Sequence, residues 1–427
     1  MLELSLVLFC ASVFGGIVVG AFAGLLPGIH VNNTSAILLG MTPALVASGL
    51  PALYVAVMIV ASTISQSFLD IVPSIFLGAP DEATAMAVLP GHRMLQEGRG
   101  VEAVRLSAMG SGLAIGASLL LMAPISLFFK SLNGPIQGYM GIILIAISAL
   151  VILSNRGKGP FAGALDRLKA IAWAAAIFLV CGLLGLAAFS AEGLLVPLVH
   201  IAAPEMLLPL LSGLFGAPTL LLSLNSSPAM PPQHKSTLSL PAGDVLRSAL
   251  AGTAAGALVS WFPAVSTGVA TTVTGMLSKK SEADDRKYIV SISGVNTANA
   301  VFSLVALYVI GHPRSGAVAA AQSAIGSIDF ETFMLLAFAM CLAGALTYPV
   351  TILAGGVASG VFTRVNYRLL NATVLLFLAA MCLAMTGFLG LAVFAVAGMA
   401  GLAPHLVNVR KTCLMGVLLV PCIIYFI

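Results

Sequence analysis

Charged side chains are scarce in this chain. Its 427 residues include 19 Lys and Arg and 15 Asp and Glu, so that 8% are charged, against roughly a quarter in a typical soluble domain. Hydrophobic residues make up 59% of the chain, and the mean hydropathy is +1.09. These values exclude an ordinary soluble domain and predict an integral membrane protein. The excess of four positive charges is too small to suggest binding to nucleic acid.

Motifs for catalysis, metal binding and nucleotide binding are also missing. The six cysteines lie in apolar stretches and form no C-x-x-C motif or Cys/His cluster, which argues against a disulfide framework and a zinc site. The sequence has no nucleophile–base pair, P-loop or glycine-rich nucleotide fingerprint. We therefore expect a protein that is not an enzyme and holds no cofactor. Transport by such a protein would draw on a gradient of solute or of a coupling ion, Na⁺ or H⁺.

Apolar stretches of membrane-crossing length recur along the whole chain, and a crossing helix needs about 20 such residues. The first stretch lacks the basic start of a signal peptide, so we expect it to be a membrane segment of the mature protein. The predicted fold class is all-α, a polytopic transmembrane helical bundle. The crossing stretches are 4–26, 52–72, 105–129, 138–154, 170–189, 194–225, 288–311, 329–362, 370–387, 390–407 and 412–427, and Pro and Gly interrupt two more at 28–48 and 245–276.

Basic residues gather in alternate connections between these stretches. Positive loops stay cytoplasmic, and placing every basic cluster inside gives an alternating path with the C-terminus outside. Only Lys130 and Arg314 then lie off the cytoplasmic side. The clusters are Arg93, Arg99 and Arg105; Arg156, Lys158, Arg167 and Lys169; Lys235 and Arg247; Lys279, Lys280, Arg286 and Lys287; Arg364 and Arg368; and Arg410 and Lys411. This pattern predicts a multi-pass protein of the cell membrane.

Two short motifs occur twice, in the same order. Gly20–Pro27 and Gly256–Pro263 each have a Gly-Ala pair with Pro seven residues after the Gly, at an offset of 236. Gly78-Ala-Pro80 and Gly311-His-Pro313 match at an offset of 233. Repeats of this kind predict a fold made of two similar halves. We place a first transmembrane repeat at 1–190, a connecting membrane segment and loop at 191–240, and a second repeat at 241–427.

The charge pattern indicates that the two repeats have opposite orientations. The loop Arg93–Arg105, after the second motif of the first half, is basic, whereas its counterpart at about 324–331 has no Lys or Arg and carries Asp329 and Glu331. Inverted repeats are typical of secondary transporters, which bind solute and ion near the midplane where the repeats meet. The alternative is a duplicated membrane protein that transports nothing.

Each half also contains a helix break with polar side chains beside it. Non-helical backbone at membrane depth is tolerated only inside protein or along a water-filled cavity. The N-termini of broken helices can bind an anion, and freed carbonyls can bind Na⁺. A kinked, tightly packed helix pair is the alternative. The candidate residues are Pro27, Gly28, His30, Asn32, Asn33 and Thr34 in the first break and Pro263, Ser266 and Thr267 in the second.

Further candidates are polar or charged residues within apolar surroundings. Thr63 and Gln66 lie opposite Asn296 and Asn299 at the repeat offset, although small polar residues often serve only as interhelical hydrogen-bonding groups. Intramembrane ionisable residues are costly and usually functional. Asp70, Asp81 and Glu82 fall in the first half, and Arg314 matches Asp81 in the second. Arg314 could bind a carboxylate or phosphate. Asp81 and Glu82 could bind Na⁺ or a proton, balance Arg314, or cap a helix after Pro80; His30 could relay protons or pack.

With these residues in view, the sequence resembles the TctA family, the large membrane subunit of tripartite tricarboxylate transporters. Gly24-Leu-Leu-Pro-Gly28 is similar to the G-x-L-P-G signature of that family, and Gly78–Ala85 with Gly91–Gly98 is similar to its second motif. Gly294–Ala300 with Gly311-His-Pro313 resembles the second-half motif. The resemblance implies a permease for di- or tricarboxylates that works with a small membrane subunit and an extracytoplasmic solute-binding protein.

The sequence also departs from that pattern. Pro90 stands at the aspartate of the family's D-G signature, the second-half acidic residue is missing, and Arg314 replaces a glycine. Pro27–Thr34 is also similar to an element of polyprenyl-phosphate transporters, so a flippase for lipid carriers is an alternative, as is a membrane scaffold without transport. The leading prediction is a carrier of small organic anions, coupled to H⁺ or Na⁺, that binds its anion at two broken helices.

Overall fold

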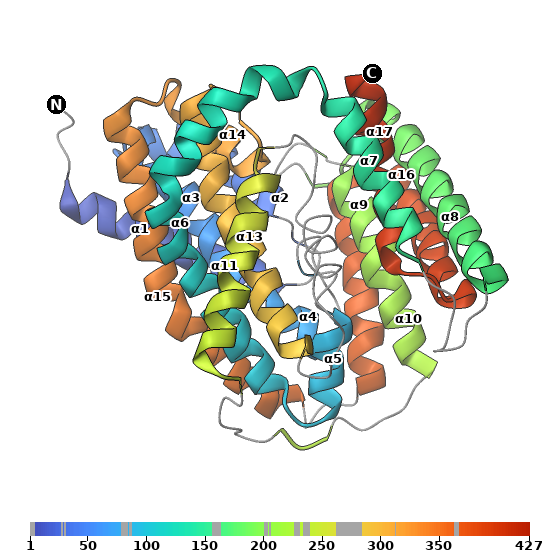
Figure 1. The fold of residues 1–427 in the computed structure, drawn as a ribbon. Coiled ribbons are helices and arrows are strands. Elements are labelled where there is room, and N and C mark those ends of the chain that lie inside the picture. Colours follow the sequence, from blue (N-terminus) through green and yellow to red (C-terminus); the bar gives the residue numbers. More distant parts are fainter. Residues whose placement is uncertain are drawn as a thin grey trace.

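The structure, a computed structural model, is helical throughout the part of the chain that it describes, and no strand occurs there (Figure 1). The described residues are 5–26, 29, 31–77, 84, 88–155, 164–199, 204, 206–225, 231–233, 240–261, 284–311, 313–362 and 367–427. The α-helices are α1 (Leu6–Leu25), α2 (Val31–Ala47), α3 (Ala52–Leu69), α4 (Ile71–Phe76), α5 (Val88–Gln96), α6 (Gly100–Gln137), α7 (Met140–Leu153), α8 (Ala164–Ser190), α9 (Leu207–Leu211), α10 (Ala217–Asn225), α11 (Ala242–Val259), α13 (Asp284–Ile310), α14 (Gly316–Ile325), α15 (Phe330–Phe362), α16 (Tyr367–Val407) and α17 (Gly416–Phe426).

The helices confirm the prediction of a polytopic membrane bundle. Seven helices among the described residues are long and apolar enough to cross a membrane, and five shorter apolar helices accompany them. The predicted stretches 370–387 and 390–407 form the two halves of α16, which bends at Gly387 (φ 71°). Within the stretch 194–225, the described helices after the 3-10 turn Glu192–Leu194 run from Leu207 through α9, the π-helical turn η3 (Ser212–Gly216) and α10. The chain is therefore an integral membrane protein with multiple crossings.

A hairpin of α1 and α2 packs against α3. The hydroxyl of Tyr54 accepts a hydrogen bond from the backbone N–H of Ser5 (2.7 Å), which joins the starts of α1 and α3. At the other end of the hairpin, Nε2 of Gln66 donates to the carbonyl oxygen of Ile29 (2.6 Å). At about 1.5 Å per residue, Gln66 lies about 21 Å along α3 from its start. Between the end of α1 at Leu25 and the start of α2 at Val31 the chain therefore reverses direction inside the membrane, and α2 returns to the face where α3 begins.

Glycines bring α1 against α3 and α11 against α13 in the same way. Gly20 lies against the carbonyl oxygen of Ser62, and Gly256 lies against that of Val295, each so closely that a Cβ would overlap. Gly16 and Gly252, one turn earlier, make equivalent contacts with Met58 and Ser291. Positions on α1 and α11 differ by 236, and those on α3 and α13 by 233. The repeat seen in the sequence is therefore a repeat of helix packing.

The two repeats have opposite orientations, as α6 and α15 show. These equivalent long helices begin at opposite ends of α13. Arg286, near the start of α13, lies 3.8 Å from the carboxylate of Glu102 at the start of α6. Tyr308, near the end of α13, stacks on Phe333 at the start of α15, with ring centroids 4.5 Å apart. Arg286 and Tyr308 are about 33 Å apart along the helix axis, about the thickness of the hydrocarbon layer. The predicted inversion is confirmed.

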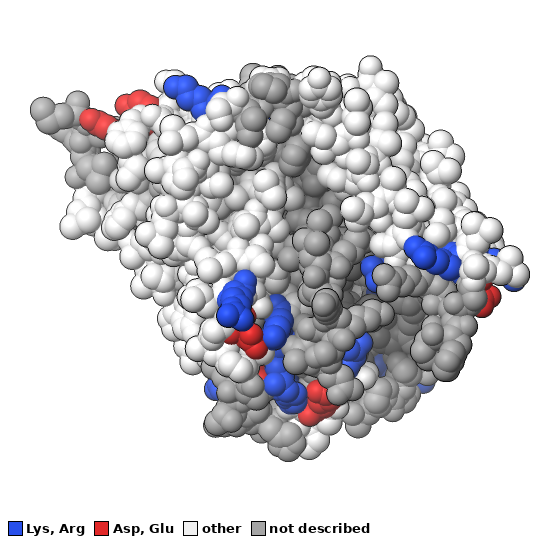
Figure 2. All heavy atoms as spheres, in the orientation of Figure 1, with Lys and Arg blue, Asp and Glu red and all other residues white. Residues whose placement is uncertain are grey.

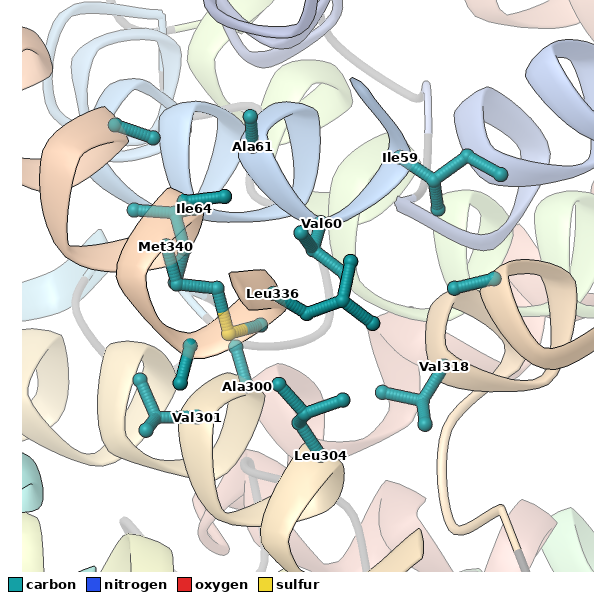
Figure 3. Packing of buried hydrophobic residues seen from close by; sticks show 14 of the residues in the cluster. Ile59, Val60, Ala61, Ile64, Ala300, Val301, Leu304, Val318, Leu336 and Met340 are labelled. Carbon is teal, nitrogen blue, oxygen red and sulfur yellow. The ribbon is translucent and has the colours of Figure 1, made fainter. Parts of the chain in front are cut away.

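The helices gather in two groups (Figure 1). In the first, α1, α3, α6, α11, α13 and α15 pack together, with α2 and α14 against α3. Its core joins the repeats where Val60 and Ile64 of α3 face Ala300 and Leu304 of α13, with Met340 of α15 between them (Figure 3). The second group has a core of its own, formed mainly by α7, α8, α9, α16 and α17, and Val259 of α11 and Val295 of α13 join it from the first group. Pairing between the repeats thus lies in the first group, while the boundaries predicted at 190 and 240 remain predictions.

Charged side chains mark one end of the first group. Figure 2 shows acidic and basic residues gathered near α5 at the lower end of the view, below a broad uncharged surface. Arg93 pairs with Asp285 and Lys287 with Asp244, at 2.5 and 2.9 Å. The C-terminus lies at the other end of the molecule from Arg410, because Phe426 contacts Gly141 at the start of α7 while Arg410 bonds to Asn155, just beyond its end. This arrangement agrees with the predicted alternating path.

Candidate functional site

The tip of the α1–α2 hairpin is held by a buried amide. Gln66 is 2% exposed, and its Oε1 accepts a hydrogen bond from the hydroxyl of Thr34 at 3.1 Å, while its Nε2 donates to Ile29. Gln66 is positioned by α3, and Thr34 lies in the first turn of α2. The amide therefore satisfies a backbone carbonyl and a hydroxyl at a depth where water is scarce.

The start of α14 lies beside the start of α2. A Cβ on Gly316 would be 2.5 Å from Oδ1 of Asn32, so the two helix starts lie close together, and a larger residue at Gly316 would displace the Asn32 side chain. Ser315 caps α14 by accepting a hydrogen bond from the N–H of Val318. Gly311 (φ 78°), before this cap, redirects the chain after α13. Two helix N-termini, from different repeats, thus come together.

Arg314 lies two residues before α14. Its side chain is half-buried, and its Nε is buried with no hydrogen-bond partner among the described residues. Helix N-termini carry partial positive charge and free N–H groups, and a guanidinium can bind a carboxylate with two parallel hydrogen bonds. The arrangement of Arg314, Asn32 and the two helix starts suits an anion.

A second polar cluster joins the repeats one turn beyond Gln66. Asp70, at the break between α3 and α4, accepts a hydrogen bond from Nδ2 of Asn296 on α13 (2.9 Å). The hydroxyls of Ser67 and Thr297 lie 3.4 Å apart beside it. Asp70 is 6% exposed. The sequence marks Asp70 as an intramembrane acid, but nothing in the sequence links it to Asn296.

The other candidate residues are divided between these places and undescribed segments. Asn299 is half-buried on α13, one turn after Asn296, where its backbone N–H lies against Gly256 of α11. Asn33 has a described place in α2 but no described side chain. The predictions for Pro27, Gly28, His30, Asp81, Glu82, Pro263, Ser266 and Thr267 fall outside the described residues. Within the described part of the chain, no group of three His, Cys, Asp or Glu could hold a metal ion.

A third polar group lies at the charged end of the molecule, and it was not identified as a candidate site from the sequence. Glu102 is fully buried and receives two hydrogen bonds of 2.9 Å from Nε and Nη2 of Arg99. With Arg286 nearby, this pair joins α6 to α13. At the opposite end, hydrogen bonds from Thr332 hold the pKa of the Asp329 carboxyl, which caps α15, below its ordinary value. These groups fix helix ends and lie apart from the two polar clusters.

Comparisons with known proteins identify the family of this chain. The family model described as "Tripartite tricarboxylate transporter TctA family" matches residues 10–416. An uncharacterized protein of Methanocaldococcus jannaschii, MJ1079, is 26% identical over 424 residues, which cover 96% of this chain and 97% of that protein. No solved structure matches. Because the family model covers nearly the whole chain, the resemblance noted in the motifs is confirmed, and the chain belongs to the tripartite tricarboxylate transporter TctA family.

Proposed function

We propose that this protein is the permease of a secondary transporter that moves small organic anions, such as di- and tricarboxylates, across the cell membrane. Membership in the TctA family supports a role as a component of a tricarboxylate transporter. The observation that carries the substrate class is the half-buried guanidinium of Arg314 just before α14, a helix whose start lies against Asn32 at the start of α2. A coupling gradient of H⁺ or Na⁺ supplies the driving force, since the sequence has no nucleotide site.

The chemistry of the Arg314 region favours carboxylates over neutral solutes. A half-buried guanidinium precedes α14, and the N-termini of α14 and α2 add partial positive charge where the repeats meet. Asn32 adds an amide group at this meeting of helix starts, against Gly316. In an inverted-repeat transporter, such a place can open to alternate faces when one repeat moves against the other.

The partners follow from the family. TctA proteins form part of transporters that also contain a small membrane subunit and a solute-binding protein. We propose that both assist this chain, the binding protein delivering the anion at the extracytoplasmic face. The lipid bilayer surrounds the exposed apolar helix surfaces, and nucleic acid is not a partner.

Uptake into proteoliposomes tests this function. Radiolabelled di- and tricarboxylates are offered under imposed H⁺ and Na⁺ gradients, with the small subunit and binding protein added where neighbouring genes encode them. We expect gradient-dependent uptake of at least one carboxylate. Absence of such uptake for every carboxylate, with all components present, would contradict the proposal.

Arg314→Ala is the matched variant for the anion site. We expect it to insert normally and to lose carboxylate uptake, because losing a paired guanidinium costs about 3 kcal/mol, or about a hundredfold in affinity. Lys130→Ala is the control: Lys130 is exposed on α6 and is the other basic residue predicted off the cytoplasmic side. Equal uptake by both variants and the wild type would remove Arg314 from the site.

A further inference from the structure

Asp70 occupies an unusual place for an acid. It forms the C-cap of α3 and precedes α4, so it lies within the buried stretch Ala52–Phe76 that is apolar enough to cross a membrane. Its side chain is 6% exposed, and Ile71 and Phe68 beside it are buried. Burying an ionised carboxylate at membrane depth is costly and usually marks a functional group.

The described partner of Asp70 belongs to the other repeat. Nδ2 of Asn296 donates to Oδ2 of Asp70 at 2.9 Å and lies 3.5 Å from the carbonyl oxygen of Ser67. Ser67 in turn faces Thr297. The sequence counterparts of Asp70 and Asn296 at the repeat offset are Ser303 and Thr63, so the acid–amide pair has no symmetric copy. The contact therefore links the repeats at one side of the α3–α13 crossing.

The described partner of Asp70, the amide of Asn296, is neutral, whereas the partners of the other buried acid, Glu102, are charged. Among the described side chains, the buried acids are Asp70 and Glu102. Two guanidinium groups lie beside Glu102, those of Arg99 at 2.8 Å and Arg286 at 3.8 Å, and neighbouring positive charges favour the carboxylate form. A carboxamide is neutral and carries both a donor and an acceptor. Asn296 can donate through Nδ2 to a carboxylate, or, after its amide group turns over, accept through Oδ1 from a carboxylic acid.

Other titratable groups lie on the helices packed around Asp70. Glu102 and Arg286 form their own cluster, and Arg286 is about 15 Å from Asn296 along α13. The groups on these helices are Cys10 on α1; His92 and Arg93 on α5; Glu102, Arg105 and Lys130 on α6; Asp285, Arg286, Lys287, Tyr288 and Tyr308 on α13; Arg314 before α14; and Glu331, Cys341 and Tyr348 on α15.

From this geometry we propose that Asp70 binds and releases the coupling proton and that Asn296 positions it. One proton adds to the Asp70 carboxylate to give a neutral carboxylic acid, and the same proton leaves on the other face of the membrane. Neutralisation removes a buried charge from the contact between α3 and α13, so binding of the proton changes the strength of the contact between the two repeats. This inference rests on the proposed function, and it narrows the coupling ion to H⁺.

Infrared difference spectroscopy tests the proton site without any substrate. The purified protein in lipid is titrated from mildly alkaline to mildly acidic pH, and the carbonyl stretch of a protonated carboxylic acid is followed. We expect a band that disappears in Asp70→Asn, remains in Glu102→Gln, and shifts in frequency in Asn296→Ala. A band unchanged in Asp70→Asn, or no band at all, would overturn the proposal. So would a band that added Na⁺ abolishes at constant pH, because that result would make Na⁺ the ligand.

Transport supplies a second, separable test. If the wild-type protein accumulates a carboxylate such as citrate under a pH gradient, Asp70→Asn should reduce that accumulation to the level of protein-free liposomes. Asp70→Glu should restore part of it with a displaced pH profile, and Ser303→Ala, at the counterpart position, should resemble the wild type. Proton-driven accumulation by Asp70→Asn would refute the assignment. Failure of the wild type to move any carboxylate would count against the proposed function, while the infrared result would still decide the proton site.

Discussion

At the scale of single residues, Gln66 shows how a polar side chain stabilises a break inside a membrane. Its oxygen accepts from Thr34 and its nitrogen donates to the carbonyl of Ile29. Backbone groups freed at a helix break have no water to bond with at membrane depth, so side chains must satisfy them. Gln66 performs this role from a neighbouring helix and thereby fixes the depth of the hairpin tip.

Replacing Gln66 with Leu should loosen the hairpin tip. The change removes two interhelical hydrogen bonds and leaves the Ile29 carbonyl without this partner, for an expected loss of about 1–3 kcal/mol. Thermal unfolding of the two proteins in detergent measures this loss of stability. Ser62→Ala is the control, because within the described part of the chain the Ser62 hydroxyl donates to the carbonyl of Ile59 in its own helix and to no other helix. A Gln66→Leu protein as stable as Ser62→Ala would show that the tip is held by other contacts.

The polar residues also show what a sequence can and cannot predict. The repeat offset pairs Thr63 with Asn296 and Gln66 with Asn299, and these pairs are equivalent positions. In the structure the contacts run differently, from Gln66 to Thr34 and from Asp70 to Asn296. A repeat shows which residues have similar surroundings, whereas contacts depend on how the two repeats cross. The polar character of the region was predictable; the partners were not.

At the scale of elements, glycine spacing sets the approach of paired helices. Gly16 and Gly20 on α1, and Gly252 and Gly256 on α11, recur every four residues and face a carbonyl on the neighbouring helix. Small residues at this spacing let helix backbones approach closely in membranes, where dispersion and packing replace the hydrophobic effect. The sequence motif that begins at Gly20 and Gly256 is therefore a packing motif as well as the approach to a predicted helix break.

Adding one methyl group at either position should destabilise the protein. In Gly20→Ala and Gly256→Ala the new Cβ overlaps a backbone carbonyl, and separating the helices should cost about 1–3 kcal/mol. Gly116→Ala in α6 is the control: no atom lies within 4 Å of the Cβ position there, and alanine favours a helix by about 0.5–1 kcal/mol. Thermal unfolding should therefore show lower stability than the wild type for Gly20→Ala and Gly256→Ala and higher stability for Gly116→Ala. Similar stability for all three would contradict close packing at these glycines.

At the scale of the whole molecule, composition and charge predicted the class of protein and its two inverted halves, but they did not predict how all the helices are arranged. Low charge predicted the membrane class, and the basic loops together with the repeat predicted two inverted halves. The second group of helices, with its core around Leu210 and Leu414, could not be predicted. Apolar residues cover the outside as well as the inside of membrane helices, so hydrophobicity does not show which helix faces touch.

The inverted fold makes a prediction about the two faces of the membrane. Gln96, at the end of α5, is exposed beside the start of α6, and Glu331 is exposed at the start of α15. Because these helices begin at opposite ends of α13, a membrane-impermeant maleimide should label Gln96→Cys and Glu331→Cys from opposite sides, in a Cys10→Ser background. Ser48→Cys lies in the exposed turn just before α3. The start of α3 lies beside the start of α1, where Ser5 bonds to Tyr54, and Phe9 near the start of α1 stacks on Phe338 of α15. Ser48→Cys should therefore label from the same side as Glu331→Cys. Labelling of Gln96→Cys and Glu331→Cys from one side would contradict the inversion, and with it a binding place formed where two opposed repeats meet.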